Sequence, residues 1–143
     1  MAEINQAQGT KFLCEIDLRW SDQDANGHVN NARAITLVEE ARVRAALHWT
    51  GTVPNGERPR VVRSLNVDFF RPINYGPELW AHVWISRIGS TSYTVHHELH
   101  QNGKPCVVAE TAIVQLNPDT QKPEPLDDHM RHTLGAALIT EQP

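Results

Sequence analysis

The sequence predicts an α+β fold in which a five-stranded antiparallel sheet wraps around one long helix. One stretch has apolar residues at the three- and four-residue spacing of an amphipathic helix, whereas the later stretches alternate apolar and polar residues between short turns. The chain has 143 residues, 40% of them apolar, which is enough for one core of ordinary size. We therefore expect a single domain over residues 1–143, with its core at about 10–120 and a C-terminal tail at 121–143.

The first strand and the helix occupy the N-terminal third of the chain. Residues 11–20 alternate loosely, which indicates a strand with one apolar face, made of Phe12, Cys14, Ile16 and Leu18. The helix should begin at Asn30 or Asn31, because asparagine is a good N-cap, and Gly51 supplies its stop. Its apolar residues recur at helical spacing at Ile35, Val38, Ala41, Ala45 and Trp49.

Four further strands should follow a loop at 52–59. The second strand ends near Pro72 and presents Leu65, Val67 and Phe69 on one face. The next strands are expected at about 79–86, 91–100 and 104–116. Asn102-Gly103 is a strong signal for a two-residue hairpin between the last two. The tail is weakly helical between Leu126 and Ile139, with a break at Gly135.

A sheet covered by one helix leaves an edge and part of its surface unprotected, so we expect two or more copies of the chain to associate. Trp80 and Trp84 are candidates for such an interface. The pattern does not distinguish a homodimer from a tetramer formed by two dimers.

Composition and charge exclude several classes of function. The 13 basic and 17 acidic residues give a net charge of −4, which offers no general attraction for nucleic acid or anionic lipid. Two cysteines, Cys14 and Cys106, are too few for a secreted disulfide framework, so a reducing cytoplasm is expected. The N-terminus lacks the features of a signal peptide, and no segment has the length and apolarity of a membrane span.

The segment from Trp20 to Ala32 carries the most chemistry. It places two carboxylates, Asp22 and Asp24, and a glycine-containing turn directly before the predicted helix. A carboxylate there can attack or activate water, and free main-chain N–H groups at the helix start can hold negative charge on a carbonyl oxygen. This arrangement can hydrolyse a thioester. Capping of the helix through a turn is the alternative role for Asp24.

Two segments of this region, Asp22–Ala32 (DQDANGHVNNA) and Val38–Arg42 (VEEAR), resemble the signature of a known family. The family is that of 4-hydroxybenzoyl-CoA thioesterase, which includes the YbgC-like acyl-CoA thioesterases. The likeness spans about residues 10–135 and continues through 67–72, 88–92 and 117–120, with Pro123 and Pro125 beyond. The resemblance implies the hotdog fold and an acyl-CoA thioesterase that needs no cofactor, because coenzyme A (CoA) belongs to its substrate.

Carried onto this sequence, the resemblance also implies the catalytic residues. The second acidic residue of the family's D-x-D pair matches Asp24, as nucleophile or as general base. The main-chain N–H that polarises the thioester carbonyl falls at Asn31. His28 can orient water or contact the acyl group, but it can equally well pack against its neighbours or cap the helix, so it ranks behind them. Asp22 is expected to stabilise the turn or to face solvent.

The phosphates of CoA should meet basic and hydroxyl groups near the turn after the third strand. The candidates there are Arg87, Ser90, Thr91 and Ser92, with Arg58, Arg60 and Arg63 from another loop or another chain. This turn lacks the consecutive basic residues of some relatives, so an acyl-carrier-protein thioester is the alternative substrate.

Other residue patterns are given structural interpretations. His96, Glu98 and His100 share one face of the fourth strand, but they have no nearby cysteine or aspartate partner, so we predict an exposed polar face and no metal site. Ser64, Ser92 and Cys106 lie in no nucleophile-elbow or Cys-His signature, which argues against serine or cysteine hydrolase chemistry.

Two rival functions follow from the same fold. Asp24, Asn26, Gly27 and His28 partly match the motif of (R)-specific enoyl-thioester hydratases, but the spacing is one residue short and the intervening proline is missing. A non-catalytic acyl-thioester binding module is the second rival, and the intact Asp24 argues against it. Thiol release, loss of enoyl absorbance, and binding without either reaction distinguish the three functions.

Overall fold

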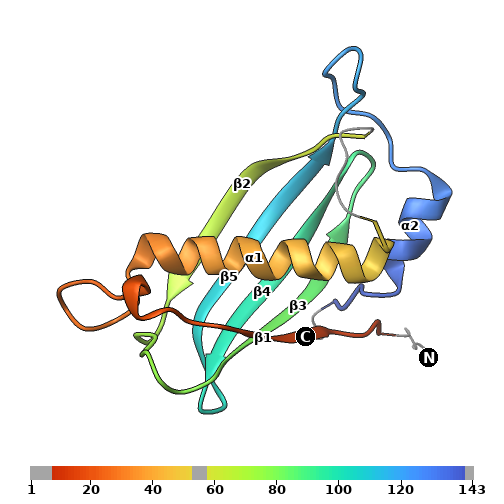
Figure 1. Ribbon diagram of the computed structural model, residues 1–143. Helices are drawn as coiled ribbons and strands as arrows, with labels where there is room; N and C mark the ends of the chain where they lie inside the picture. The colour runs from red at the N-terminus through yellow and green to blue at the C-terminus, as the bar shows by residue number, and fades with distance from the viewer. Residues whose placement is uncertain (1–7, 53–57, 141–143) are drawn as a thin grey trace.

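The computed structural model describes residues 8–52 and 58–140, so residues 53–57 of the predicted loop lie outside the described part. Figure 1 shows one long helix lying across a curved antiparallel sheet. This confirms the predicted fold class. The elements in chain order are β1 (Phe12–Ile16), the 3₁₀ turn η2 (Trp20–Asp22), α1 (Asn31–Thr50), β2 (Arg60–Phe69), β3 (Leu79–Ile88), β4 (Ser92–Gln101), β5 (Lys104–Gln115) and α2 (Asp128–Gly135).

The boundaries of α1 are those that its capping residues predict. The side chain of Asn30 accepts the main-chain N–H of Ala32 at 2.8 Å, which caps the N-terminus. Gly51 closes the helix in the left-handed region, with φ of 73°. The buried face of α1 consists of Ala34, Val38, Ala41 and Ala45. Three of these four are alanines, whose small side chains allow the helix to approach the sheet closely.

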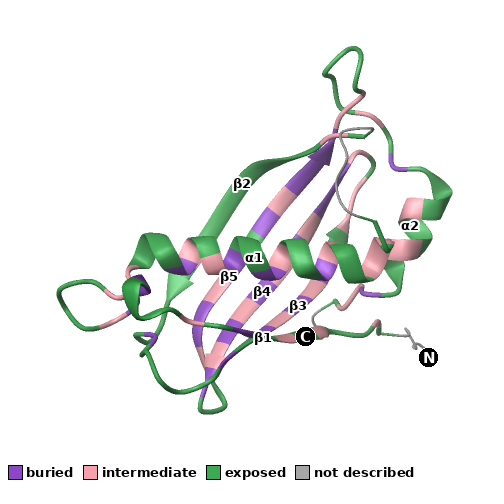
Figure 2. Ribbon diagram, viewed as in Figure 1, coloured by how far each residue is buried: buried purple, intermediate pink, exposed green. Residues whose placement is uncertain are grey.

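The strand order in the sheet is β1-β3-β4-β5-β2, so within the described part of the chain β2 forms one edge and pairs only with β5. Helix α1 packs on β1, β3 and β4. As a result most of β2 is exposed in Figure 2, with Leu65 and Phe69 41% and 44% exposed and only Val67 half-buried. The apolar face predicted for this strand exists, but the helix does not cover it within one chain.

Two local predictions are confirmed and one is wrong. Asn102 and Gly103 form the β4–β5 turn with φ of 54° and 74°, as a two-residue hairpin requires. The tail forms α2, which ends at Gly135. The first strand, however, ends at Ile16 rather than Trp20. The chain leaves the sheet there and turns at η2, where Trp20 is 73% exposed.

Neither helix of the described part has the length and apolarity to cross a membrane. Cys14 and Cys106 are both free thiols.

Candidate active site

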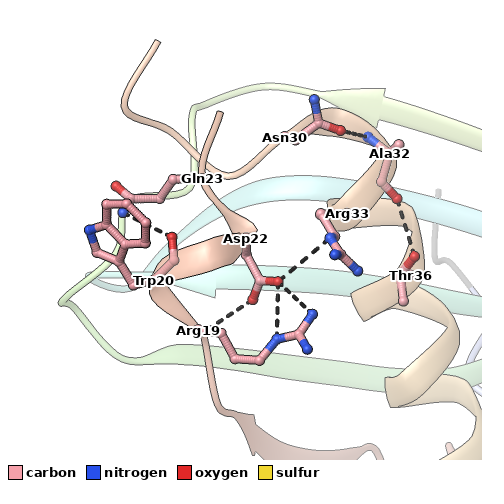
Figure 3. A network of polar contacts seen from close by, with 8 residues as sticks. All are labelled: Arg19, Trp20, Asp22, Gln23, Asn30, Ala32, Arg33 and Thr36. Atoms are coloured by element: carbon pink, nitrogen blue, oxygen red, sulfur yellow. Dashed lines mark hydrogen bonds and ion pairs between the residues drawn. The ribbon is translucent and has the colours of Figure 1, made fainter. Parts of the chain in front are cut away.

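The buried carboxylate of Asp22 anchors the loop before α1. It accepts hydrogen bonds from the main-chain N–H of Arg19 at 2.9 Å and from the guanidinium of the same residue at 3.0 Å. The guanidinium of Arg33 in α1 lies 3.8 Å away (Figure 3). Burial raises the pKa of Asp22, but the hydrogen bonds and charge of Arg19, together with the charge of Arg33, outweigh it and hold the pKa below its usual value. Asp22 therefore ties η2 to the helix and stabilises the turn.

Asp24 lies in the tight turn that follows, and its side chain is exposed. Its Oδ1 accepts the main-chain N–H of Asn26 at 2.9 Å, and its own main-chain N–H donates to the carbonyl of His28 at 2.9 Å. Gly27 closes the turn with φ of 79°, a conformation that favours glycine. The other carboxylate oxygen, Oδ2, lies 3.5 Å from Nδ2 of Asn30. The turn thus points the carboxylate toward the start of α1.

The start of α1 offers an unused main-chain donor. Asn30 uses its side-chain oxygen to cap Ala32 and its carbonyl to accept the N–H of Ala34. The main-chain N–H of Asn31 has no acceptor among the residues that the structure describes. The first N–H groups of a helix carry a partial positive charge and stabilise anions. This donor has the chemistry of an oxyanion hole.

One groove, with a volume of about 360 Å³, joins these groups. Asp24, His28 and Asn31 line it, together with Phe69, the last residue of β2, and Phe70. The structure therefore brings together the three residues that the sequence predicted as catalytic. It also gives the groove an apolar wall, because Phe69 is 44% and Phe70 is 61% exposed.

Three features of this groove were not predicted from the sequence. Asn30 reaches Asp24 as well as capping the helix. Asn74 orients His28, since its Oδ1 lies 3.0 Å from the imidazole Nδ1. Phe69 had been predicted as part of a strand face, and both phenylalanines lie in the 67–72 segment of the family resemblance, but neither had been assigned to the site. A pair of adjacent aromatic residues before a proline at a strand end was the available signal.

The predicted CoA-binding residues lie elsewhere in the chain. Arg87 is exposed near the end of β3, and Ser90, Thr91 and Ser92 form the turn into β4, where Ser92 is buried. Arg60 begins β2, nine residues before Phe69, which corresponds to about 30 Å of strand. One chain therefore does not place these residues beside the Asp24 groove, and their role in binding CoA stays a prediction.

The polar face of β4 is occupied by an internal hydrogen-bond network. Glu98 lies 2.9 Å from His96 and 2.9 Å from His100, and His96 also lies 3.0 Å from Glu110 of β5. The three side chains share one face, as predicted, but they are half-buried rather than exposed. Within residues 8–52 and 58–140, no group of three or more histidine, cysteine or acidic side chains is arranged to hold a metal ion.

Comparison with known proteins identifies the family. Residues 18–134 match the model of the thioesterase-like superfamily. The chain belongs to this superfamily. The relatives of this thioesterase-like protein include the uncharacterized protein YsmA of Bacillus subtilis, which is 30% identical over 125 residues, or 86% of this chain and 84% of YsmA.

Two solved structures extend the comparison. A predicted thioesterase from Bacillus stearothermophilus is 30% identical, with a TM-score of 0.86 over 93% of this chain and 100% of the other. A thioesterase from Thermus thermophilus, complexed with coenzyme A and zinc, is 30% identical, with a TM-score of 0.77 over 87% and 92%. The protein is accordingly a thioester hydrolase of the hotdog fold. The closer likeness to 4-hydroxybenzoyl-CoA thioesterases stays a prediction.

Proposed function

We propose that the protein hydrolyses an acyl-CoA thioester, with Asp24 as its reactive carboxylate and the main-chain N–H of Asn31 as the donor to the carbonyl oxygen. One observation carries the proposal: the Asp24 side chain and the start of α1 border the same groove and are linked through Asn30. The relative from Thermus thermophilus, which is complexed with CoA, supports the choice of substrate.

Two routes use this geometry. As general base, Asp24 takes a proton from water, whose oxygen adds to the carbonyl carbon, and the resulting oxyanion accepts the N–H of Asn31. The carbon–sulfur bond then breaks, and the CoA thiolate leaves and takes up a proton. As nucleophile, the carboxylate displaces the thiolate directly and forms a mixed anhydride, which water cleaves to the free acid and the carboxylate.

We further propose that the active unit contains at least two chains. No described strand pairs with the outer edge of β2, and Val61, Val62, Leu65 and Phe69 on this strand are each 41–46% exposed. Antiparallel pairing of β2 with a second copy, centred on the middle of the strand, would set Phe69 beside the partner's Arg60. Such pairing would bring the predicted CoA-binding arginine to the Asp24 groove.

A panel of acyl-CoAs and acyl-carrier-protein thioesters tests the proposed function. Free thiol is followed with a thiol reagent, and enoyl absorbance is followed in parallel. Thiol release with at least one acyl-CoA is the expected result. Loss of enoyl absorbance without thiol release, or saturable binding without either reaction, would contradict it. A preference for the carrier-protein thioesters would mean that the substrate is an acyl-carrier-protein thioester rather than an acyl-CoA.

A further inference from the structure

A second cavity, with a volume of about 190 Å³, lies at the other end of α1 from Asp24. It is lined by residues of the C-terminal half of α1, the start of β2, the inner face of β4 and β5, and α2. Among the residues that the structure describes, it shares no lining residue with the Asp24 groove. Its floor is apolar and includes Trp49, Val95, Ile113 and Leu134. A floor of this kind favours the hydrocarbon part of a ligand.

Three guanidinium groups from different parts of the chain line the same cavity. Arg42 comes from α1, Arg58 from the segment before β2, and Arg60 from the start of β2. Two of them have carboxylate partners: Arg42 lies 3.4 Å from Glu39, and Arg58 lies 3.2 Å from Glu124. Among the described residues no carboxylate lies within ion-pair distance of Arg60.

Tyr93 adds a hydroxyl to the polar groups of this cavity. Tyr93 lines the cavity and is only 6% exposed. Burial raises the pKa of its phenol, against the opposing charges of Arg60 and Arg42, which lie near it. The hydroxyl therefore keeps its proton at neutral pH and can donate it to an anion that the arginines attract.

The size and chemistry of the cavity define its ligand. A dry protein cavity of about 150 Å³ accommodates benzene, so this one accommodates a ring or chain of that size with one polar group. Arginine binds carboxylates through two parallel hydrogen bonds. We propose that this cavity binds a small apolar carboxylate, with the hydrocarbon on the floor formed by Trp49 and Ile113 and the carboxylate held by Arg60 and Tyr93.

Such a carboxylate has two possible sources. It can be a free acid, or it can be the far end of an acyl group in a thioester whose reactive end occupies another chain's Asp24 groove. Only the second source rests on the proposed function. The two are distinguished by comparing kcat/KM for glutaryl-CoA and valeryl-CoA, which differ by one terminal carboxylate. A preference for glutaryl-CoA that disappears in Arg60→Gln assigns the acyl source, and an unchanged ratio assigns the free acid.

Binding to the full-length protein tests the proposal without any need for turnover. Cyclohexanecarboxylate and its neutral amide are titrated while the indole N–H resonance of Trp49 is followed by NMR, with Trp49→Phe used for assignment. We expect the acid to shift this resonance and to bind at least about tenfold more tightly than the amide, because a hydrogen bond to a charged group is lost in the amide complex. Arg60→Gln should remove that difference.

Two variants serve as controls. Arg63→Gln changes an arginine on the same strand that does not line the cavity, and Asp24→Asn changes the separate groove. Both should bind the acid as the wild type does. Equal affinity for acid and amide in the wild type would overturn the proposal. So would an equal loss of binding in Arg60→Gln and Arg63→Gln, or resonance shifts confined to the surroundings of Asp24.

Discussion

The side chain of Asn30 contacts both halves of the candidate active site. Its Oδ1 accepts the N–H of Ala32 at 2.8 Å and caps α1, while its Nδ2 lies 3.5 Å from Oδ2 of Asp24. This contact keeps the proposed reactive carboxylate of Asp24 next to the helix start that supplies the proposed oxyanion donor. A change at Asn30 should separate these two roles.

Replacing Asn30 by serine should lower activity while keeping stability. Serine retains the N-cap but loses the donor to Asp24, so we expect kcat to fall by about tenfold, the scale of a hydrogen bond to a charged group. Asn30→Ala should lower kcat in the same way and also cost about 1 kcal/mol of stability, because the cap is lost. Steady-state kinetics and urea unfolding measure both effects. Wild-type kcat in Asn30→Ser would show that the contact has no role in turnover.

Replacing Asn31 by proline should remove the proposed oxyanion donor without disrupting the helix. Proline is well tolerated at the first helical position, and Asn30, with ψ of 142°, already has the extended conformation that a residue before proline prefers. We expect kcat to fall about 10²- to 10³-fold, as for the loss of one oxyanion-hole donor. Asn31→Ala keeps the N–H and is the matched control, with activity close to the wild type. Equal activities of Asn31→Pro and Asn31→Ala would mean that the main-chain N–H of Asn31 is not the oxyanion donor.

His97 should make the protein sensitive to acid. It is fully buried, with Nε2 3.0 Å from the hydroxyl of Thr111 and, among the described residues, no partner for Nδ1. Burial, helped by the charges of Arg42 and His96, lowers the pKa of His97 to about 3 from 6.5. The unfolded chain therefore binds a proton between pH 6.5 and about 3 that the folded chain does not, so stability falls as the pH falls through this window.

From pH 7 to pH 5 this one group should cost about 2 kcal/mol of unfolding free energy. Between pH 7 and pH 5, the His97→Gln variant should lose about 2 kcal/mol less unfolding free energy than the wild type, whatever its stability at pH 7. Urea unfolding at the two pH values measures the difference. His129→Gln, which replaces an exposed histidine of α2, is the control and should behave as the wild type. The same pH dependence in His97→Gln and the wild type would mean that other groups cause it.

Replacing Leu65 by glutamate should separate the proposed association from the fold. Leu65 is 41% exposed in the middle of the edge strand β2, so a charge there should disrupt pairing with a second copy and leave the chain folded. We expect a monomer by light scattering and a clear loss of kcat/KM. Leu13→Glu changes a 53% exposed leucine on the opposite edge strand, β1, and should stay associated and active. If Leu65→Glu had the same mass in solution as the wild type, β2 would not form the interface.

Local signals in the sequence account for the elements that were predicted well. The helix begins at Asn31 and ends before Gly51 because an asparagine cap and a glycine in the left-handed conformation act within a few residues. The Asn102-Gly103 hairpin is equally local, since each residue adopts the positive φ that the turn requires.

The features that could not be predicted depend on contacts between distant parts of the chain. Nothing local indicates that β2 pairs with β5 at the sheet edge, or that Phe69 lines the same groove as Asp24. The position of Arg60, far from that groove in one chain, follows from the same topology. Asp22 and Asp24 look alike in the sequence, and only the contacts of Arg19 distinguish the buried anchor from the exposed carboxylate.

Thiol release by Asp24→Asn in a single turnover tests the central claim most directly. Asparagine keeps an oxygen that can accept the N–H of Asn26, so the turn and the melting temperature should be preserved. With the best acyl-CoA of the panel and enzyme in excess, we expect the rate to fall by about 10²-fold or more, on the scale of lost general-base catalysis. Thiol release at the wild-type rate by a folded Asp24→Asn protein would contradict the assignment of Asp24 as the reactive carboxylate.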